Sequence, residues 1–284
     1  MSERYLIIGA GGQLGRALQA QYPQARAVDH DALNIGSLES IEEFDWSPYS
    51  TIFNAAAWTN VDAAQNDQNR EEVWRVNALG PMHLAQKAQK HNFALVHIST
   101  DYVFDGTKDN YKENDSVSPL SAYGASKAAA DLAVSMHEKH YILRTSWVIG
   151  DGNNFVRTMM DLAGRNISPK VVNDQIGRLT FASELVRGID HLLTNTCEYG
   201  VYNLSNAGDP VSWFEIAQEV FALCSREKDD VNGISTAEYF QGRDDIAPRP
   251  KCSMLDLSKL ESVGFSPHDW RNDLQEHVKR KGVA

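Results

Sequence analysis

Short apolar runs alternate with longer amphipathic segments through the first half of the chain. The apolar runs are the expected strands, and they cover Tyr5–Ile8, Ala25–Val28, Thr51–Asn54, Phe93–Ser99 and Tyr141–Thr145. The segments between them have helical periodicity, and they cover Gln13–Tyr22, Ser37–Phe44, Gln68–His91 and Ala122–His137. Strands that are apolar throughout and alternate with helices are typical of a parallel sheet covered on both faces. The pattern therefore predicts a doubly wound α/β fold.

The alternation loosens after about residue 150, where the expected elements become shorter. They are helices at Asn153–Ala163, Ala182–Leu193 and Trp213–Cys224, strands at Val171–Val172 and Val201–Leu204, and short helices at Leu255–Leu260 and Trp270–Val278. The stretch between, residues 226–250, is charged and rich in turn residues. We expect residues 1–150 to form a nucleotide-binding domain, to which about 171–195 return. Residues 151–284 then form mainly a smaller C-terminal substrate-binding lobe.

A glycine-rich segment joins the first expected strand to the first expected helix. Its sequence, residues 9–15, is Gly-Ala-Gly-Gly-Gln-Leu-Gly. Glycine at positions 9, 12 and 15 allows a tight turn, close approach of the backbone to a pyrophosphate, and close packing of helix on strand. The free N–H groups at the helix N-terminus can then bind phosphate. The segment predicts dinucleotide binding by a parallel-sheet Rossmann domain, although a purely structural glycine turn has a similar pattern.

Two further features follow the second and third expected strands. Asp29 lies where a carboxylate can accept hydrogen bonds from the adenosine ribose and repel a 2′-phosphate, which favours NADH. Positive charge from His30, Arg16 or Arg26 leaves NADPH open, and a solvated loop carboxylate is the alternative interpretation. Ala55, Ala56 and Ala57 leave room for a flat ligand at a strand end, or serve tight packing.

The most informative residues are Thr100, at the end of the fourth strand, and Tyr123 and Lys127, at the start of the following helix. Tyr123 and Lys127 are four residues apart and therefore on one helix face. A nearby ammonium is expected to lower the pKa of the phenol, and Thr100 can hydrogen-bond the oxygen that gains the proton. The set predicts general acid catalysis. In contrast, His97 is expected to be a packed or solvated residue, and Trp213 and Trp270 are expected in the core.

Composition narrows the class of protein. The chain has 27 Lys and Arg against 38 Asp and Glu, a net charge of −11, which argues against binding nucleic acid or anionic membranes. With 42% hydrophobic and 23% charged residues it is an ordinary globular protein. Its three cysteines indicate neither a disulfide framework nor a zinc site. No signal peptide or membrane-spanning stretch is expected, so we predict a cytoplasmic protein.

Several longer strings resemble the dTDP-4-dehydrorhamnose reductase family of the extended short-chain dehydrogenase/reductase superfamily. The strings are Gly12–Gly15, Asn54–Asp62, Val76–Ala78, Ser99–Gly106, Tyr123–Lys127, Arg144–Val148, Gly152–Val156, Val172–Gly177 and Arg249–Pro250. Ser-Thr-Asp-Tyr-Val-Phe-Asp-Gly and Arg-Thr-Ser-Trp-Val are the most specific of them. The resemblance extends from residue 9 to residue 250, which is nearly the whole chain.

The resemblance implies reduction of the 4-keto group of dTDP-4-dehydro-6-deoxy-L-mannose (dTDP-4-dehydrorhamnose) to dTDP-L-rhamnose with NADH or NADPH. It implies that Tyr123 donates the proton, that Lys127 tunes it and binds the nicotinamide ribose, and that Thr100 is the third catalytic group. The positions that correspond to cofactor contacts are Gly9, Gly12, Gln13, Leu14, Gly15, Asp29, Asn34, Ile35, Ala55, Ala56, Ala57, Tyr123 and Lys127. Those that correspond to substrate contacts are Thr100, Asp101 and Trp147.

Two departures from the family pattern matter. Leu33-Asn34-Ile35 stands where the family often has an acidic residue, so one polar contact to the cofactor is expected to change. Some members bind Mg²⁺ at a dimer interface through glutamates; Glu184 matches one such position, but Arg16 and Ala17 stand where another is expected. Because an octahedral Mg²⁺ site depends on carboxylates, we predict no metal and a monomer or weak homodimer.

Two other functions are compatible with the sequence. The same Thr, Tyr and Lys set serves other sugar-nucleotide 4-ketoreductases and 4-epimerases. A fold resembling this family also acts as a non-catalytic regulatory subunit of methionine adenosyltransferase. That role does not require Thr100, Tyr123 and Lys127 together, and their joint presence favours the enzyme.

Overall fold

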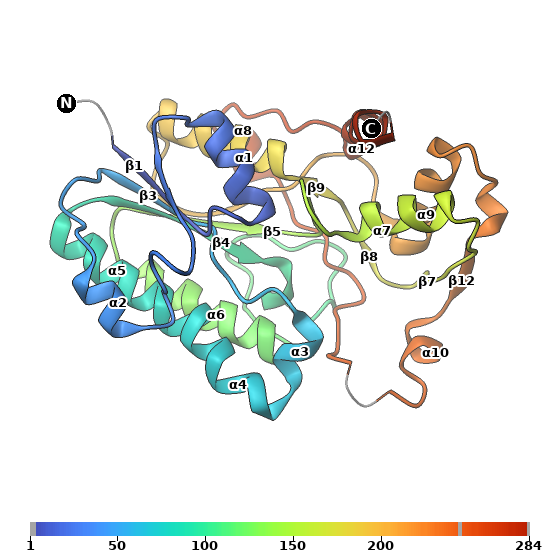
Figure 1. The fold of residues 1–284 in the computed structure, drawn as a ribbon, viewed down its shortest axis with the longest axis horizontal. Coiled ribbons are helices and arrows are strands. Elements are labelled where there is room, and N and C mark those ends of the chain that lie inside the picture. Colours follow the sequence, from blue (N-terminus) through green and yellow to red (C-terminus); the bar gives the residue numbers. More distant parts are fainter. Residues whose placement is uncertain (1–3, 244–245, 283–284) are drawn as a thin grey trace.

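A six-stranded sheet forms the centre of the molecule, as the computed structural model in Figure 1 shows; residues 4–243 and 246–282 are described. The strands lie in the order β10-β5-β4-β3-β1-β2, and every neighbouring pair is parallel. They are β1 (Tyr5–Ile8), β2 (Arg26–Val28), β3 (Thr51–Asn54), β4 (Ala94–Thr100), β5 (His140–Thr145) and β10 (Gly200–Asn203). The predicted doubly wound Rossmann fold is confirmed.

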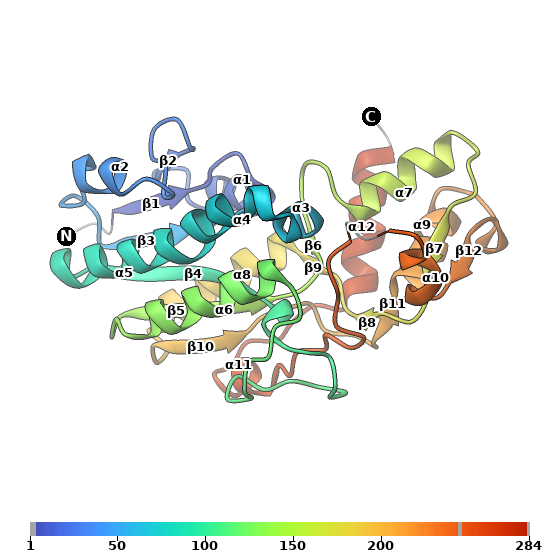
Figure 2. The ribbon, with the colours of Figure 1, turned by 90° about the horizontal axis from the view of Figure 1, so that it is seen from below.

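Helices cover both faces of this sheet (Figures 1 and 2). One face carries α2 (Leu38–Glu43), α4 (Asp67–Trp74), α5 (Gly80–His91) and α6 (Ala122–Ser135), with α3 (Val61–Gln65) beyond the strand ends. The other face carries α1 (Gln13–Gln21) and α8 (Ala182–Thr194). Successive strand residues point to opposite faces, so Leu6 and Ile8 enter one core and Ile7 enters the other. The fully apolar strands predicted from the sequence are explained by these two cores.

The strand order reverses at β1, which lies between β2 and β3. The chain leaves β1 toward one edge of the sheet and resumes at β3 toward the other. In open α/β sheets, ligands bind at such a switch point, outside the carboxyl ends of the strands. Both the glycine-rich turn after β1 and the alanines after β3 are placed at this point.

A second, smaller group of elements lies beside the sheet (Figure 2). Its short strands pair as β6 (Val148–Ile149) with β9 (Thr180–Phe181), β7 (Lys170–Val172) with β12 (Asn232–Ile234), and β8 (Ile176–Gly177) with β11 (Val211–Ser212). Its helices are α7 (Phe155–Gly164), α9 (Trp213–Leu223), α10 (Thr236–Phe240) and α12 (Trp270–Gly282). Val156, Ile216 and Trp270 help to form a separate hydrophobic core there.

Two expectations about the chain path differ from the structure. The predicted helix Gln68–His91 is interrupted by a π-helical turn, Arg75–Leu79, between α4 and α5. The strand predicted at Val201–Leu204 is β10 and pairs with β5 in the central sheet, and α11 (Ser258–Ser262) contacts it. A division near residue 150 stays a prediction. Of the later segments, α8 and β10 pack with the central sheet. Residues 170–177, part of the segment predicted to return to the nucleotide-binding domain, instead pair with strands of the smaller group.

None of the described helices has the length and apolar character needed to span a bilayer.

Candidate active site

A cleft with a volume of about 790 Å³ is lined by the residues that follow β1, β2, β3 and β4. It brings together all the residues predicted to contact cofactor or substrate except Gly15. Residues more than 200 positions apart in the chain meet in it, from Ile8 to Trp213. The residues predicted to contact the cofactor and those predicted to contact the substrate therefore line one continuous cleft.

The glycine-rich turn is shaped as its sequence predicts. Gly9 has a φ of +82°, and a Cβ on it would lie 2.7 Å from the backbone nitrogen of Ala56. A Cβ on Gly15 would overlap the carbonyl oxygen of Gly9, which explains why this glycine lies beneath the turn and not in the cleft. Helix α1 begins at Gln13 with Gly12 as its N-cap and no acidic residue in its first turn. The N-terminus of α1 has no side-chain cap, and its first residues Gln13 and Leu14 line the cleft, so this helix N-terminus fits a pyrophosphate group.

Asp29 and Asn34 lie along the same wall of the cleft. The Asp29 carboxylate accepts a hydrogen bond of 2.6 Å from the backbone N–H of Gly11. It is exposed and lies in the cleft wall with His30 and Arg16, so charges of both signs meet there. The Asn34 side chain accepts from the N–H of Gly36 and thereby stabilises its own loop.

The π-helical turn positions the alanines that follow β3. The amide of Asn77 accepts a hydrogen bond of 2.8 Å from the N–H of Trp58 and donates to the Trp58 carbonyl and to Ser126. This clamp ties Trp58, the residue that follows Ala55–Ala57, to Ser126 of α6. A π-turn inside a helix frequently marks a functional site. Here the π-turn contains Asn77, whose buried side-chain amide hydrogen-bonds the backbone of Trp58. In the sequence Asn77 belongs only to the family string Val76–Ala78, and its contact with Trp58 is found only in the structure.

Tyr123 and Lys127 lie on α6 and face the end of β4, where Thr100 is. Ser121 caps this helix by accepting from the N–H of Gly124. Burial raises the pKa of Tyr123 to about 12; the Asp101 and Asp131 carboxylates also raise it, and a hydrogen bond with Thr100 lowers it. The prediction that Lys127 lowers this pKa toward neutrality is wrong for this structure: burial raises the pKa, and the Lys127 ammonium is not among the groups that shift it.

Lys127 is only 2% exposed. Its ammonium donates to the carbonyl of Ile98 at 2.6 Å and lies 3.3 Å from Nε2 of His97. Burial lowers the pKa of Lys127 to about 8, although the Asp131 carboxylate raises it. The sequence predicts that His97 is packed or solvated; it is fully buried and contacts Lys127, a relationship that no sequence pattern indicates.

Asp101 and Tyr102 continue the site behind Thr100. Burial raises the pKa of Asp101 to about 7, and its carboxylate accepts from the Thr100 hydroxyl at 2.9 Å. The Tyr102 ring lies edge-on to the Tyr123 ring, with centroids 6.2 Å apart. Burial also raises the pKa of Tyr102, and Arg249 hydrogen-bonds to it. Arg249 in turn forms an ion pair with Asp62 on α3. Arg249, from the Arg249–Pro250 string of the sequence, thus connects Tyr102 of the cleft to α3.

An aromatic stack forms the far wall of the cleft. Trp147 and Trp213 are stacked with ring centroids 3.8 Å apart and an interplanar angle of 20°, and Phe155 lies 4.6 Å from Trp213. Trp147 has a φ of +45°, a strained backbone conformation for a bulky residue, of the kind that clusters at functional sites. The prediction that Trp213 is a core residue is incomplete, since it is only partly buried and lines the cleft. Trp270 is fully buried, as predicted.

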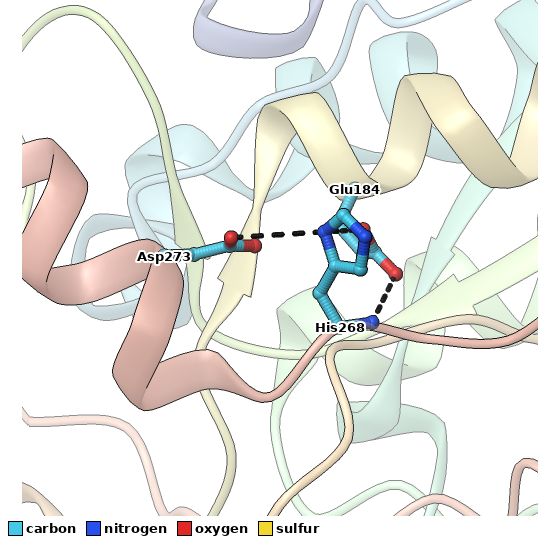
Figure 3. Close-up of side chains that lie close together, drawn as sticks. All are labelled: Glu184, His268 and Asp273. Atoms are coloured by element: carbon cyan, nitrogen blue, oxygen red, sulfur yellow. Dashed lines mark hydrogen bonds and ion pairs between the residues drawn. The ribbon is translucent and has the colours of Figure 1, made fainter.

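Glu184, His268 and Asp273 lie together at the junction of α8 and α12 (Figure 3), with possible ligand atoms within 4.8 Å of one another. One Glu184 oxygen accepts from the backbone N–H of His268 at 2.8 Å, and the other pairs with Arg187 at 2.5 Å. A carboxylate already shared between an amide and a guanidinium does not fit Mg²⁺, which needs free carboxylate oxygens in octahedral geometry. These residues therefore join two helices, and the absence of a metal stays a prediction.

Comparison with known proteins identifies the family. A family model described as "RmlD substrate binding domain" matches residues 3–282. A dTDP-4-dehydrorhamnose reductase of Aggregatibacter actinomycetemcomitans is 40% identical over 294 residues, which cover 96% of this chain and 97% of that protein. The chain belongs to the dTDP-4-dehydrorhamnose reductase family. The family resemblance inferred from the sequence strings is confirmed.

Two further relatives are informative. The crystal structure of a Bacillus anthracis dTDP-4-dehydrorhamnose reductase in complex with NADP has a TM-score of 0.90 and 34% identity, and covers 99% of this chain and 100% of that one. A probable dTDP-4,6-dihydroxy-2-methyloxan-3-one 4-ketoreductase of Streptomyces antibioticus is 34% identical over 96% of this chain and 94% of that protein. The reductase family thus includes proteins named for different keto sugars.

Proposed function

We propose that this protein reduces the 4-keto group of dTDP-4-dehydrorhamnose to give dTDP-L-rhamnose, with NADH or NADPH as reductant. The observation that carries the proposal is the convergence of Thr100, Tyr123 and Lys127 on the cleft that also contains the glycine-rich turn. A dinucleotide whose pyrophosphate lies on that turn and a sugar at the aromatic stack would meet at these three side chains. The names of the relatives supply the class of sugar nucleotide.

The cofactor, when bound, supplies a hydride to C4 of the sugar. The residues of this chain protonate the C4 oxygen and orient the proton donor. As hydride reaches C4, the C4–O double bond becomes a single bond and the oxygen gains charge. Tyr123 keeps its proton at neutral pH, because its pKa is about 12, and donates it to that oxygen. Thr100 hydrogen-bonds the Tyr123 hydroxyl and so orients the donor. Lys127 provides positive charge beside the phenolate that remains and an N–H for the nicotinamide ribose.

The substrate end of the cleft is assigned to Asp101 and Trp147 together with Thr100. An aromatic plane is suited to the C–H face or methyl group of a deoxysugar, and Trp213 extends that plane. Asp101, with a pKa of about 7, can accept or donate a hydrogen bond to a sugar hydroxyl near neutral pH.

Either nicotinamide cofactor is proposed to bind. The single feature that favours NADH is the Asp29 carboxylate in the cleft wall, which would repel a 2′-phosphate. Arg16 and His30 line the same wall, and the Bacillus anthracis relative was solved with NADP, so NADPH is an equally open choice. If Asp29 decides the preference, Asp29→Ala raises the ratio of kcat/KM for NADPH to that for NADH, whereas an unchanged ratio would show that Asp29 does not select the cofactor.

The test is cofactor oxidation with dTDP-4-keto-6-deoxy-L-hexose generated in situ, using NADH and NADPH separately and identifying the product. Formation of dTDP-L-rhamnose with turnover supports the proposal. The matched control is the UDP-linked keto sugar, which tests whether the site recognises thymine. Tight cofactor binding without oxidation would overturn it.

The same assay distinguishes the two alternative functions, a reductase of another keto sugar and a non-catalytic regulatory subunit. Turnover only with another dTDP-linked keto sugar favours a related 4-ketoreductase, as the Streptomyces antibioticus relative suggests by its name. Cofactor binding without turnover of any keto sugar favours the non-catalytic regulatory role. The geometry favours the enzyme, since a regulatory subunit does not require Tyr, Lys and Thr side chains together in one cleft.

The cytoplasmic location and the monomer or weak homodimer expected from the sequence belong to this proposal. Size-exclusion chromatography with light scattering measures the second of these directly.

A further inference from the structure

We infer that His97 is the positioning residue of Lys127: the neutral imidazole accepts one N–H of the ammonium and so directs the remaining N–H into the cleft. The inference rests on the proposed function for the catalytic importance of Lys127. It goes further by assigning a role to a residue that does not line the cleft.

The contacts of Lys127 leave little choice of partner. An ammonium has three N–H donors and no acceptor. One donor is used by the Ile98 carbonyl at 2.6 Å, and Nε2 of His97 is 3.3 Å away. Lys127 lines the cleft, so the third donor is the one available to a ligand. Without His97, a group that is only 2% exposed would keep an N–H with no acceptor, which is costly in a buried site.

His97 is itself held in place by the sheet. It lies in β4, is fully buried, and is the register partner of Asn54 in β3. Its Nδ1 is 3.1 Å from the side-chain nitrogen of Asn54. A strand residue fixed between a neighbouring strand and α6 has few rotamers available, so it is a rigid reference point for the long Lys127 side chain.

The charges around this pair keep the imidazole neutral. Burial and the Lys127 ammonium lower the pKa of His97 well below its usual value. Asp131, on the same helix as Lys127, raises the pKa of the lysine but is itself paired with Arg144 of β5. Tyr123 is protonated, and Asn54 of β3 carries no charge. The imidazole therefore acts as a neutral hydrogen-bond partner and does not compete with Lys127 for the proton.

Each charge state of Lys127 has a matching tautomer of His97. The ammonium form requires Nε2 to accept, so the imidazole proton is then on Nδ1. This tautomer requires the Asn54 amide to be turned so that its buried oxygen Oδ1, which has no other hydrogen-bond partner, accepts from Nδ1–H. When Lys127 loses its proton, its lone pair can accept from Nε2–H, and Nδ1 accepts from the Asn54 amide. A histidine can satisfy Lys127 in both states by moving its own proton between nitrogens, which a glutamine could imitate and an aliphatic residue could not.

The first test reads the tautomer without enzyme activity. In the full chain with ¹⁵N-labelled histidine, the His97 nitrogen shifts are followed by NMR across the titration of Lys127. We expect a neutral imidazole throughout, Nδ1–H at low pH, and a change to Nε2–H that disappears in Lys127→Met. An imidazolium signal, or a tautomer that ignores Lys127→Met, would overturn the inference. Because this readout needs no substrate, it is independent of the proposed function.

The second test compares variants of one strand. His97→Leu should lower kcat at least ~10-fold through misplacement of the ammonium. It should also move the alkaline limb of the kcat–pH profile to lower pH, because an unpaired buried ammonium loses its proton more readily. His97→Gln should restore both properties in large part. Val96→Ala is the control, since Val96 is equally buried in β4 but faces the opposite core. Far-UV circular dichroism checks that each variant folds, and a His97→Gln variant as impaired as His97→Leu would contradict the inference.

Discussion

Among the residues of the site, Tyr123 matters most for the proposed reaction because its phenol keeps its proton. Tyr123 and Lys127 both line the cleft from one helix, but the lowering of the tyrosine pKa expected from their spacing is not found, because burial raises it. The reversal suits a reductase, because a phenol that stays protonated is ready to donate. Such a donor releases its proton only to a strong base, and an oxygen that has just received hydride at its carbon is one.

Replacing Tyr123 by Phe should therefore abolish most turnover while leaving cofactor binding intact. We expect kcat to fall ~10²-fold or more, the usual contribution of a positioned general acid. The matched control is Tyr102→Phe, which keeps the ring edge against Tyr123 and removes only the hydroxyl that bonds Arg249. Steady-state kinetics and NADPH titration measure both variants. A Tyr123→Phe enzyme with wild-type kcat would show that another group supplies the proton.

Helix α6 is the element on which the site depends, since it carries both Tyr123 and Lys127. Its first turn approaches the 3-10 turn Asp101–Val103, which follows β4, so closely that a Cβ on Gly124 would overlap the carbonyl oxygen of Tyr102. Glycine is needed here for space and not for a special backbone angle. In the sequence this glycine stands out only as part of a family string.

Gly124→Ala should push the start of α6 away from β4. Overpacking of this kind costs ~1–3 kcal/mol of unfolding free energy, so we expect a lower Tm. We also expect a fall in kcat of at least ~10-fold from the displaced Tyr123. Gly164→Ala, at the end of α7 where a Cβ would meet nothing within 4 Å, is the control and should leave both quantities near wild type. Equal effects of the two substitutions would refute the packing argument.

At the scale of the molecule, a buried ion pair ties the catalytic helix to the sheet. Arg144 of β5 and Asp131 of α6 are 3.0 Å apart, with side chains 6% and 5% exposed. Arg144 also donates to the carbonyl of Glu113, whose carboxylate accepts from the N–H of Asn203 in β10. The pair thus links α6 to the strand that the second half of the chain contributes to the sheet.

Asp131→Ala should be strongly destabilising, by ~3–5 kcal/mol, because it leaves a buried guanidinium without its counter-charge. Asp161→Ala, which removes the exposed partner of Arg157, is the control and should change stability by at most ~0.5 kcal/mol. Urea denaturation gives both free energies of unfolding. A small effect of Asp131→Ala would mean that water or another carboxylate compensates Arg144.

The junction between α8 and α12 leads to a prediction about metals. Because Arg187 and a backbone N–H already occupy the Glu184 carboxylate, dialysis against EDTA should change neither Tm nor turnover. Added Mg²⁺ should likewise leave the sedimentation behaviour unchanged. A rise in Tm with Mg²⁺ that Glu184→Gln abolishes would contradict this expectation.

Local signals were sufficient for much of the architecture and of the site. Apolar runs, helical periodicity and the glycine spacing act over a few residues. The strands of the sheet, the dinucleotide turn and the Thr100, Tyr123 and Lys127 set can therefore be predicted from the amino-acid sequence alone. The family strings then placed Asp101 and Trp147 at the same cleft.

Other properties depend on which distant segments meet, and no short-range pattern carries that information. The entry of β10 into the central sheet, the π-turn clamp of Asn77 and the position of Trp213 in the cleft wall all arise from long-range packing. The direction of the Tyr123 pKa and the contact of His97 with Lys127 have the same origin, because desolvation and hydrogen-bond partners are set by the completed core. The types of catalytic residue can thus be predicted from the sequence, while their pKa values and hydrogen-bond partners are set by burial in the folded molecule.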